Sequence, residues 1–445
     1  MTSPVSATLP AFGHEAPTAL SRADTQEDVT PSEIAVGVII GRSSEYFDFF
    51  VFGIACVLVF PFLLFPHLSR LDGTLMSFAI LSIAFVARPL GTAISMAIQR
   101  RWGRGTKLTV SLFLLGVCTV SMAFLPSYDE VGMMAIVAVS VLRFGQGLAL
   151  GGSWDGLPSL LAMAAPEQRR GWYAMMGQLG APLGFVLAAS LFAYLHSNLS
   201  SQEFLAWGWR YPFFVAFAVN VVALFARLRL VVGQSYAELL QERELEPLGV
   251  ARVLRDEGGN VLLGAFAALA SFALFHLVTV FPLSWIAMNS DRSITEVLGV
   301  QMVGAVLGAG AIVASGWLAD RMGRRRLLGT MAMLIGVFSF ATPWLLGGGM
   351  AANNVFLLLG FVLLGLSYGQ SSGTVTSNFP ASHRYTGAAL STDIAWLLGA
   401  AFAPLVALGL SVRFGLGAVS LYLLSGVVCT LGALRINRLL EQQRD

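Results

Sequence analysis

GRSSEYFDFFVFG, residues 41–53, places two carboxylates inside an apolar run that extends from about residue 34 to residue 64. The run exceeds the roughly 20 residues that a helix needs to cross a bilayer. At a rise of about 1.5 Å per residue, Glu45 lies about 16 Å from Ile34, near the middle of a hydrocarbon core of about 30 Å. A carboxylate at that depth costs about 2.5–3.5 kcal/mol, so we expect Glu45 and Asp48 to have a function or a compensating partner.

The two carboxylates share one side of the predicted helix. Gly41, Glu45, Asp48 and Phe52 follow 4-3-4 spacing, which forms a single stripe along an α-helix. An acidic stripe at membrane depth favours either a proton site or a charge network between helices.

The composition is that of a polytopic membrane protein. Of 445 residues, 56% are hydrophobic and 12% are charged, whereas soluble domains carry about 25% charged residues. The net charge of +2 gives no reason to expect nucleic acid as a partner. The three cysteines stand alone in apolar runs without metal-ligand spacing. We therefore expect a protein of the lipid bilayer with no metal site and no organic cofactor.

Twelve apolar segments have the length of membrane-spanning helices. They lie near residues 34–62, 74–99, 107–126, 131–163, 170–195, 210–230, 259–287, 295–319, 327–347, 353–379, 385–410 and 412–435. A polar linker at 231–258 divides them into six and six, which predicts bundles at 34–230 and 259–436. Residues 1–33 are polar and predicted to be a disordered tail, and residues 437–445 form a second tail.

Lysine and arginine in the short loops predict the orientation. One set of loops carries Arg100, Arg101, Arg104, Lys107, Arg169, Arg170, Arg321, Arg324, Arg325, Arg326 and Arg384, and the opposite set carries Arg70, Arg210, Arg292 and Arg413. The richer set is predicted to face the cytoplasm. Both termini and the linker then lie there as well, in a bacterial-type inner membrane.

The two halves repeat one loop. Residues 101–104 read Arg-Trp-Gly-Arg after span two, and residues 321–324 read Arg-Met-Gly-Arg after span eight. Corresponding loops in two six-span halves are typical of a duplicated transporter, whose substrate site lies between the repeats near the midplane.

Residues 316–326, GWLADRMGRRR, resemble the cytoplasmic loop signature of the major facilitator superfamily. Within it the chain is similar to the metabolite:proton symporter family. The matching motifs are EYFDFF at 45–50, RPLG at 88–91, LRFGQG at 142–147, RGWY at 170–173, QLGAPLG at 178–184 and RYTG at 384–387. The resemblance implies an all-α membrane protein of twelve transmembrane helices in two pseudo-symmetric six-helix bundles. Spans one, four, seven and ten would line a central cavity.

Two positions depart from the family pattern. The family's first loop has an acidic residue where this chain has Arg100, whereas the second loop retains Asp320. In span four the family reads Gly-Gly-Glu-Trp-Gly-Gly, and this chain has Ser153 and Asp155 in that motif. The carboxylate has moved by two positions and therefore points from another face of the helix.

The charged residues expected at membrane depth include more carboxylates than arginines. They are the carboxylates Glu45, Asp48, Asp155 and Asp393 and the arginines Arg88 and Arg143. Two uncompensated negative charges are too costly there, so at least one carboxylate is expected to be protonated during part of the cycle. The same excess would alternatively attract a cationic or zwitterionic substrate. Glu45 and Asp48 are the candidate proton-coupling residues, and the structural alternative is permanent pairing with Arg88 or Arg143.

Arg143 in span four is the candidate ligand for an anion, because a guanidinium holds a carboxylate through two parallel hydrogen bonds. The alternative is a permanent pair with Glu45 or Asp48. Arg88 lies nearer the cytoplasm and is assigned to gating, and Asp393 is expected to support span ten. Further candidates for substrate contact are Tyr46, Gln178, His276, Tyr368 and Gln370. A lone histidine such as His276 is alternatively a packing residue.

The arginine-rich loops are expected to latch the cytoplasmic gate, and the alternative is that they only set the topology. The latch residues are Arg101, Gly103, Arg104, Gly316, Asp320, Arg321, Gly323, Arg324 and Arg325. Neither loop has the Gly-x-x-x-x-Gly-Lys-Ser/Thr pattern of nucleotide binding, so ATP-driven transport is not expected.

Together these features predict a secondary transporter and not an enzyme. The expected function is proton-coupled symport of a small organic acid anion by alternating access, by a monomer. The alternatives are uptake of a zwitterionic osmolyte such as a betaine or proline, facilitated diffusion without protons, and a non-transporting sensor. The complete signature at 320–326 weighs against the sensor.

Overall fold

The computed structural model describes residues 31–153, 161, 166–231, 246–371 and 379–442. Within these ranges the chain forms helices and short connections, and no strand occurs. Residues 1–30 of the predicted tail, residues 232–245 of the predicted linker and Asp155 lie outside the described residues.

The first bundle is formed by the chain up to residue 231. Its helices are α1 (Pro31–Leu58), α2 (Phe60–Leu63), α3 (Arg70–Met122), α4 (Tyr128–Val131), α5 (Met133–Gly152), η1 (Glu167–Arg169), α7 (Arg170–Met176), η2 (Gly177–Leu179), α8 (Gly180–Asn198), α9 (Ser201–Ala206), η3 (Gly208–Arg210) and α10 (Tyr211–Val231).

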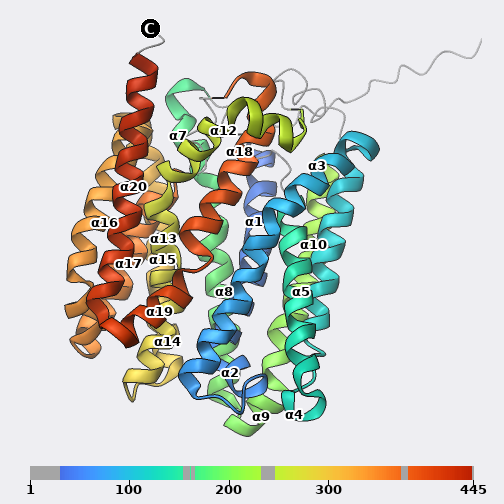
Figure 1. Ribbon diagram of the computed structural model, residues 1–445, viewed down its shortest axis with the longest axis vertical. Helices are drawn as coiled ribbons and strands as arrows, with labels where there is room; N and C mark the ends of the chain where they lie inside the picture. The colour runs from blue at the N-terminus through green and yellow to red at the C-terminus, as the bar shows by residue number, and fades with distance from the viewer. Residues whose placement is uncertain (1–30, 154–160, 162–165, 232–245, 372–378, 443–445) are drawn as a thin grey trace, which may run out of the picture.

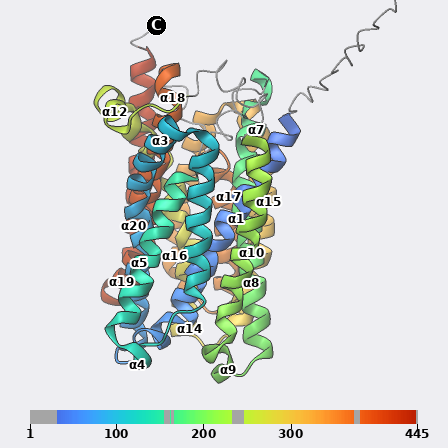
Figure 2. The same cartoon turned by 90° about the vertical axis from the view of Figure 1, so that its right-hand side faces the viewer.

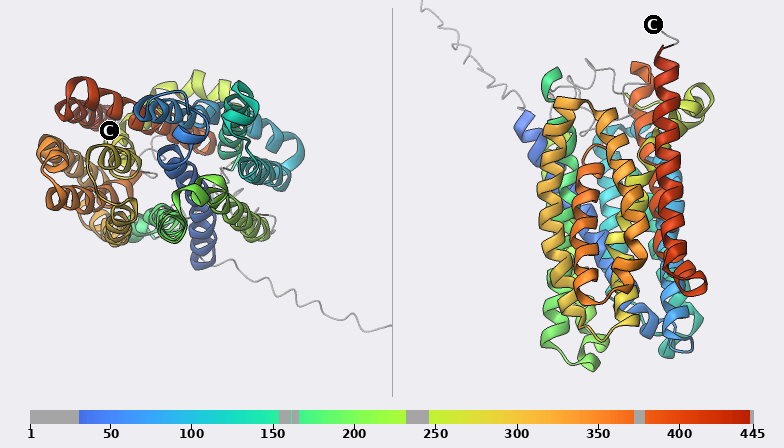
Figure 3. Two further views of the ribbon diagram at one scale, coloured as in Figure 1. Left: turned by 90° about the horizontal axis from the view of Figure 1, so that it is seen from below. Right: turned by 90° about the vertical axis from the view of Figure 1, so that its left-hand side faces the viewer.

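The second bundle follows from residue 250. Its helices are α12 (Val250–Ala267), α13 (Leu269–Val278), α14 (Val280–Asn289), α15 (Ile294–Met322), α16 (Arg324–Gly347), α17 (Met350–Tyr368), α18 (Ala381–Ala395), the π-helical turn η6 (Trp396–Ala400), α19 (Ala403–Phe414) and α20 (Leu416–Gln442). The two bundles lie side by side when viewed along their common axis (Figure 3, left).

The predicted number of membrane spans is confirmed. Ten helical runs of the described chain are long and apolar enough to cross a membrane. One of these, α3, contains two spans that meet at Gly103. The helix α1, which carries Glu45 and Asp48 amid its apolar residues, completes the twelve spans. The protein therefore has two pseudo-symmetric six-helix bundles, as the sequence resemblance implied.

Some boundaries differ from the predicted ones. Span seven is not one straight helix, because the backbone departs from regular helix at Ala268 and Thr279 between α12, α13 and α14. The helix α12 begins inside the predicted linker, and α20 continues into the predicted C-terminal tail. The last two spans separate at Gly415, whose φ of 77° ends α19.

The repeated loop turns on two glycines. Gly103 and Gly323 both have φ of 85°, a backbone conformation that a residue with a Cβ rarely adopts. They separate spans two and three in the first bundle and α15 and α16 in the second. We call this end of the molecule, with the arginines that flank these glycines, the basic end. The helix α1 begins and α20 ends at it, whereas α4 and α9 lie at the opposite end (Figures 1 and 2).

Aromatic side chains fill the interface between the bundles near its centre. The ring of Phe50 in α1 stacks on Phe275 in α13 at 5.6 Å between centroids. Phe49 meets Phe275 at 6.3 Å and Trp396 at 6.1 Å. Such pairs contribute about 0.5–1.5 kcal/mol each beyond the burial of their area. They position α1 against the second bundle and surround the polar residues described next.

Candidate functional site

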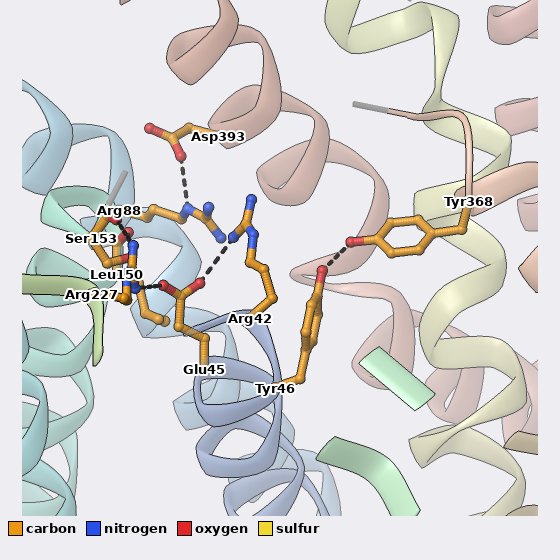
Figure 4. Close-up of polar contacts among 9 residues, drawn as sticks. All are labelled: Arg42, Glu45, Tyr46, Arg88, Leu150, Ser153, Arg227, Tyr368 and Asp393. Carbon is orange, nitrogen blue, oxygen red and sulfur yellow. Dashed lines mark hydrogen bonds and ion pairs between the residues drawn. The ribbon is translucent and has the colours of Figure 1, made fainter. Parts of the chain in front are cut away.

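Glu45 is held by two arginines from opposite directions (Figure 4). Nη1 of Arg42, one turn earlier in α1, lies 2.9 Å from Oε2 of Glu45. Nη1 of Arg227 in α10 lies 2.6 Å from Oε1. Nη2 of Arg227 also donates to the carbonyl oxygen of Ser153 at 2.5 Å. The charge of Glu45 is thus compensated twice, and each carboxylate oxygen has its own arginine.

Gly41 makes room for Arg227 beside α1. A Cβ at this position would meet Cδ of Arg227 at 2.7 Å. The glycine of the stripe identified in the sequence therefore has a steric function, since it lets a side chain from α10 reach Glu45.

Arg88 and Asp393 join the two bundles. Nε of Arg88 in α3 donates to Oδ1 of Asp393 in α18 at 2.7 Å, and the Thr92 hydroxyl donates to Oδ2. The guanidinium of Arg88 lies 6.0 Å from the ring centroid of Trp396. Asp393 was expected to support span ten, but its partners lie on α3. The pair therefore ties the first bundle to the second, which agrees with a gating assignment for Arg88.

Tyr46 and Tyr368 form a second link between the bundles. Their hydroxyl groups share a hydrogen bond, and both side chains are buried. Figure 4 shows the two hydroxyl groups meeting between α1 and α17. The sequence placed both residues among the candidates for substrate contact.

A pocket, called the central pocket here, lies between the bundles on the side of the Tyr46–Tyr368 bond that faces the basic end. Its lining includes Arg42, Gln178, Tyr368, Ser391, Thr392 and Trp396. Two sequence candidates, Gln178 and Tyr368, meet there. Gln178 belongs to η2 and Tyr368 ends α17, so both bundles contribute.

Asp48 belongs to a different network from Glu45. The Thr119 hydroxyl donates to its Oδ1 at 2.5 Å, and the Gln146 side-chain amide donates to its Oδ2 at 3.2 Å. The carbonyl oxygen of Gln146 accepts from Nη1 of Arg143 at 2.9 Å. An uncharged amide thus stands between Asp48 and Arg143. The alternative role of Arg143, a permanent ion pair with Glu45 or Asp48, is not formed among the described residues.

Arg143 and His276 are buried and incompletely bonded. Nε of Arg143 donates to the Leu81 carbonyl at 3.3 Å, and its guanidinium lies 4.2 Å from the Phe52 ring centroid. Among the described residues, neither Nη2 of Arg143 nor either ring nitrogen of His276 has a hydrogen-bond partner. The His276 ring packs against Phe49 at 5.1 Å. Neither residue lines the central pocket in this conformation.

The balance of charge at the centre is the reverse of the expected one. The described residues there are the carboxylates Glu45, Asp48 and Asp393 and the arginines Arg42, Arg88, Arg143 and Arg227. Three negative charges face four positive ones, so the expected acidic excess was wrong. Even if Asp155 is added, the charges only balance. The difference comes from Arg42 and Arg227, which the predicted balance did not include. Both lie within predicted spans, and Arg42 is one helical turn from Glu45.

The second repeated loop contacts the first bundle through Asp320. Its Oδ1 accepts from the backbone N–H of Gly171 at 2.6 Å and its Oδ2 from that of Trp172 at 3.1 Å. These N–H groups begin α7, where a carboxylate is favoured by the helix dipole. Gln370 reinforces the contact by donating to the Gly171 carbonyl at 3.1 Å and accepting from Nε of Arg324 at 3.2 Å. Gln370, a candidate for substrate contact, thus belongs to this contact, and it is not among the residues that line the central pocket.

The other predicted latch residues of the second loop are close to Asp320 in the chain. A Cβ on Gly316 would lie 3.1 Å from Cα of Trp172, so α15 and α7 approach closely there. Arg321 is exposed and stacks on Trp317 at 3.8 Å. Arg325 follows Arg324 in the first turn of α16.

The first repeated loop makes a different contact. Nζ of Lys107 donates to the Tyr385 hydroxyl at 3.2 Å, and that hydroxyl donates to Oε1 of Gln99 at 3.2 Å. Lys107 is buried, whereas Arg101 is exposed and stacks on Trp102 at 5.0 Å. Arg104, like its counterpart in the second loop, stands directly after the turn glycine. The first loop thus contacts α18 of the second bundle through Lys107 and Tyr385, whereas the second loop contacts α7 of the first bundle through the Asp320 carboxylate.

Two helical bundles with repeated loops, joined by polar contacts around a central pocket, define a membrane transporter. The chain belongs to the Major Facilitator Superfamily, whose family model matches residues 131–404. Its resemblance to the metabolite transporters of that superfamily is confirmed by its relatives.

The relatives align along most of the chain. The inner membrane metabolite transport protein YhjE of Escherichia coli (strain K12) is 36% identical, over 92% of this chain and 96% of the relative. The shikimate transporter of the same strain is 29% identical, over 92% of this chain and 94% of the relative. The proline/betaine transporter of that strain is 26% identical, over 81% of this chain and 74% of the relative. The crystal structure of a D-xylose-proton symporter has a TM-score of 0.68 at 17% identity and covers 91% of this chain and 96% of its own, which shows the shared fold.

Proposed function

We propose that this transporter carries a small organic acid anion together with protons by alternating access, as a monomer in a bacterial-type inner membrane. The observation that carries the proposal is the charge distribution at the centre. Among the described residues, four arginines and three carboxylates are gathered there, so an added anion improves the balance of these charges and an added cation worsens it. A relative named as a shikimate transporter supports an acid as the substrate.

Asp48 is the better candidate for the proton carrier. Glu45 faces two guanidinium groups, which stabilise its charged form. Asp48 is equally buried, but its described donors are a hydroxyl and an amide. An ionised carboxylate without a direct cation is costly in this surrounding, and a bound proton removes that cost. Arg143, joined to Asp48 through Gln146, would sense whether Asp48 carries the proton.

Alternating access requires that contacts between the bundles break in turn. Three such contacts lie at different depths: Arg88 with Asp393, Tyr46 with Tyr368, and Asp320 with Gly171. Opening at the basic end would release the Asp320 contact. We assign the basic end to the cytoplasm, because arginine and lysine are concentrated in cytoplasmic loops. Both termini would then be cytoplasmic.

A zwitterionic osmolyte is the second candidate substrate. The central pocket has aromatic walls at Phe272, Tyr368 and Trp396, and such faces attract quaternary ammonium groups. A relative named as a proline/betaine transporter supports this candidate. The positive balance of the described buried charges favours the anion over the zwitterion.

Uptake into proteoliposomes tests the proposal. Purified protein would be given shikimate, gluconate, glycerate, glycine betaine and proline, each with and without an imposed pH gradient. The proposal expects accumulation of an acid that depends on the gradient, and empty liposomes are the control. Equal uptake with and without the gradient would indicate facilitated diffusion. Accumulation of betaine or proline with none of the acids would contradict the anion assignment.

A further inference from the structure

We propose that Arg42 binds the carboxylate of the substrate, and that Glu45 occupies Arg42 in the substrate-free protein. The inference rests on the proposed function, because it names the anion's ligand and narrows its class. The sequence had given this role to Arg143.

Arg42 has the accessibility that the role requires. Of the four arginines at the centre, Arg42 is the one that lines the central pocket. Its side chain is 16% exposed. The corresponding values are 9% for Arg88 and 5% for Arg227, and Arg143 is fully buried. Of these four arginines, Arg42 is therefore the one that a molecule in this pocket can contact.

Arg42 is also the arginine that can be released. Within the described residues its guanidinium makes one ion pair, through Nη1 to Oε2 of Glu45. When Arg42 turns toward a substrate, Oε1 of Glu45 keeps Arg227 at 2.6 Å, and Arg227 stays anchored on the Ser153 carbonyl. The buried carboxylate thus retains a cation in both states, and the large penalty for an unpaired buried charge is avoided. The substrate's carboxylate gains the planar two-bond fork of the guanidinium.

The other walls of the pocket narrow the class of substrate. Gln178, Ser391 and Thr392 offer hydrogen-bonding groups, whereas Phe272 and Trp396 offer apolar ring faces. No second arginine lines this pocket in the described part of the chain. A single guanidinium with several neutral polar groups and two ring faces fits a small hydroxylated monocarboxylate better than a dicarboxylate.

Exchange across proteoliposomes tests the role of Arg42 without involving the pH gradient. The probes are D-glycerate, gluconate and shikimate. Each acid is compared with its primary amide, which has nearly the same shape but no charge. We expect wild type to exchange an acid and to reject its amide. Arg42→Gln should raise the KM for that acid roughly 10- to 100-fold, as expected for loss of a charged hydrogen-bonded pair, and should abolish the preference over the amide. Arg42→Lys should give an intermediate KM, because an ammonium lacks the fork.

Glu45→Gln gives the opposite expectation and is the second test. It removes the internal competitor of the substrate, so the KM for the acid should fall below the wild-type value. Ligand-induced shifts in melting temperature of the purified variant would show the same gain in affinity. Arg413→Gln, at the opposite end of the molecule, is the matched control and should leave the KM unchanged.

The outcomes separate this inference from the proposed function. If wild type exchanges none of the acids, the anion assignment fails and the role of Arg42 fails with it. If wild type exchanges an acid but Arg42→Gln retains both the KM and the preference for the acid over the amide, the anion assignment stands and Arg42 is not its ligand. A KM that rises in Glu45→Gln would also overturn the competitor role of Glu45.

Discussion

Nη1 of Arg227 lies 2.6 Å from Oε1 of Glu45, although the two residues are 182 positions apart in the chain. The bond joins the sixth span of the first bundle to its first span, and Gly41 provides the space for it. Glu45 therefore does not supply the uncompensated charge that the sequence suggested. That property belongs to Asp48, one turn further along α1, and several predictions depend on the difference.

Asp48→Asn should uncouple transport from protons. Because asparagine stays neutral at every pH, accumulation driven by a pH gradient should disappear, whereas substrate exchange should persist. Glu45→Gln is the paired variant and should retain gradient-driven accumulation. Both quantities can be measured in the same vesicles.

The reverse pattern, with coupling lost in Glu45→Gln and retained in Asp48→Asn, would make Glu45 the carrier. Loss of exchange and of stability together in both variants would show that the acidic stripe is a structural charge network.

Arg227→Gln should destabilise the protein strongly. It removes a buried cation from Glu45 and a donor from the Ser153 carbonyl, and breaking one side of a buried ion pair costs about 3–5 kcal/mol. The melting temperature of the purified protein in detergent is the measurement, with Arg413→Gln as the exposed control. A melting temperature equal to that of wild type would mean that Arg42 alone compensates Glu45.

Arg143→Lys should weaken proton coupling and leave the substrate's KM unchanged. A lysine has a single nitrogen in place of Nε and Nη1, which bond the Leu81 carbonyl and Gln146 separately, and it lacks the flat guanidinium that lies over Phe52. Exchange kinetics and gradient-driven accumulation distinguish the two effects. A raised KM for an acid with coupling intact would return the role of anion ligand to Arg143.

Asp320→Asn should slow transport while the protein remains inserted. The amide keeps one acceptor oxygen, so one of the bonds from Gly171 and Trp172 is lost, at a cost of about 0.5–2 kcal/mol for a helix cap. Initial uptake rates at matched expression are the measurement. Asp72→Asn, in the first turn of α3 at the opposite end, is the control. Normal rates in Asp320→Asn would remove the latch assignment.

Reporter fusions at residues 20 and 440 should both report the cytoplasm. The prediction follows from the arginines of the basic end, where α1 begins and α20 ends. A fusion after residue 199, between α8 and α9, should report the opposite side and serves as the control. A periplasmic signal from either terminal fusion would contradict the orientation.

The sequence by itself determined the architecture of this protein. Apolar runs of membrane length, a polar linker and the repeated loops around Gly103 and Gly323 were enough to give twelve spans in two bundles. These features are local, because hydropathy and a glycine with positive φ depend on a few neighbouring residues. The sequence also singled out Tyr46 and Tyr368, whose hydroxyl groups share a hydrogen bond between the bundles, Gln178, which lines the central pocket with Tyr368, and Asp320, which contacts α7.

The tertiary structure decided which charges face one another. Arg227 compensates Glu45, Arg88 compensates Asp393, and Gln146 separates Arg143 from Asp48. A hydrophobic pattern shows that a charged residue lies in a span, but the rotation and packing of each helix choose its partner. The free-energy cost of a buried charge depends on that partner within a few ångströms. The roles of Arg42 and Asp48 therefore emerge from contacts between helices that are far apart in the sequence.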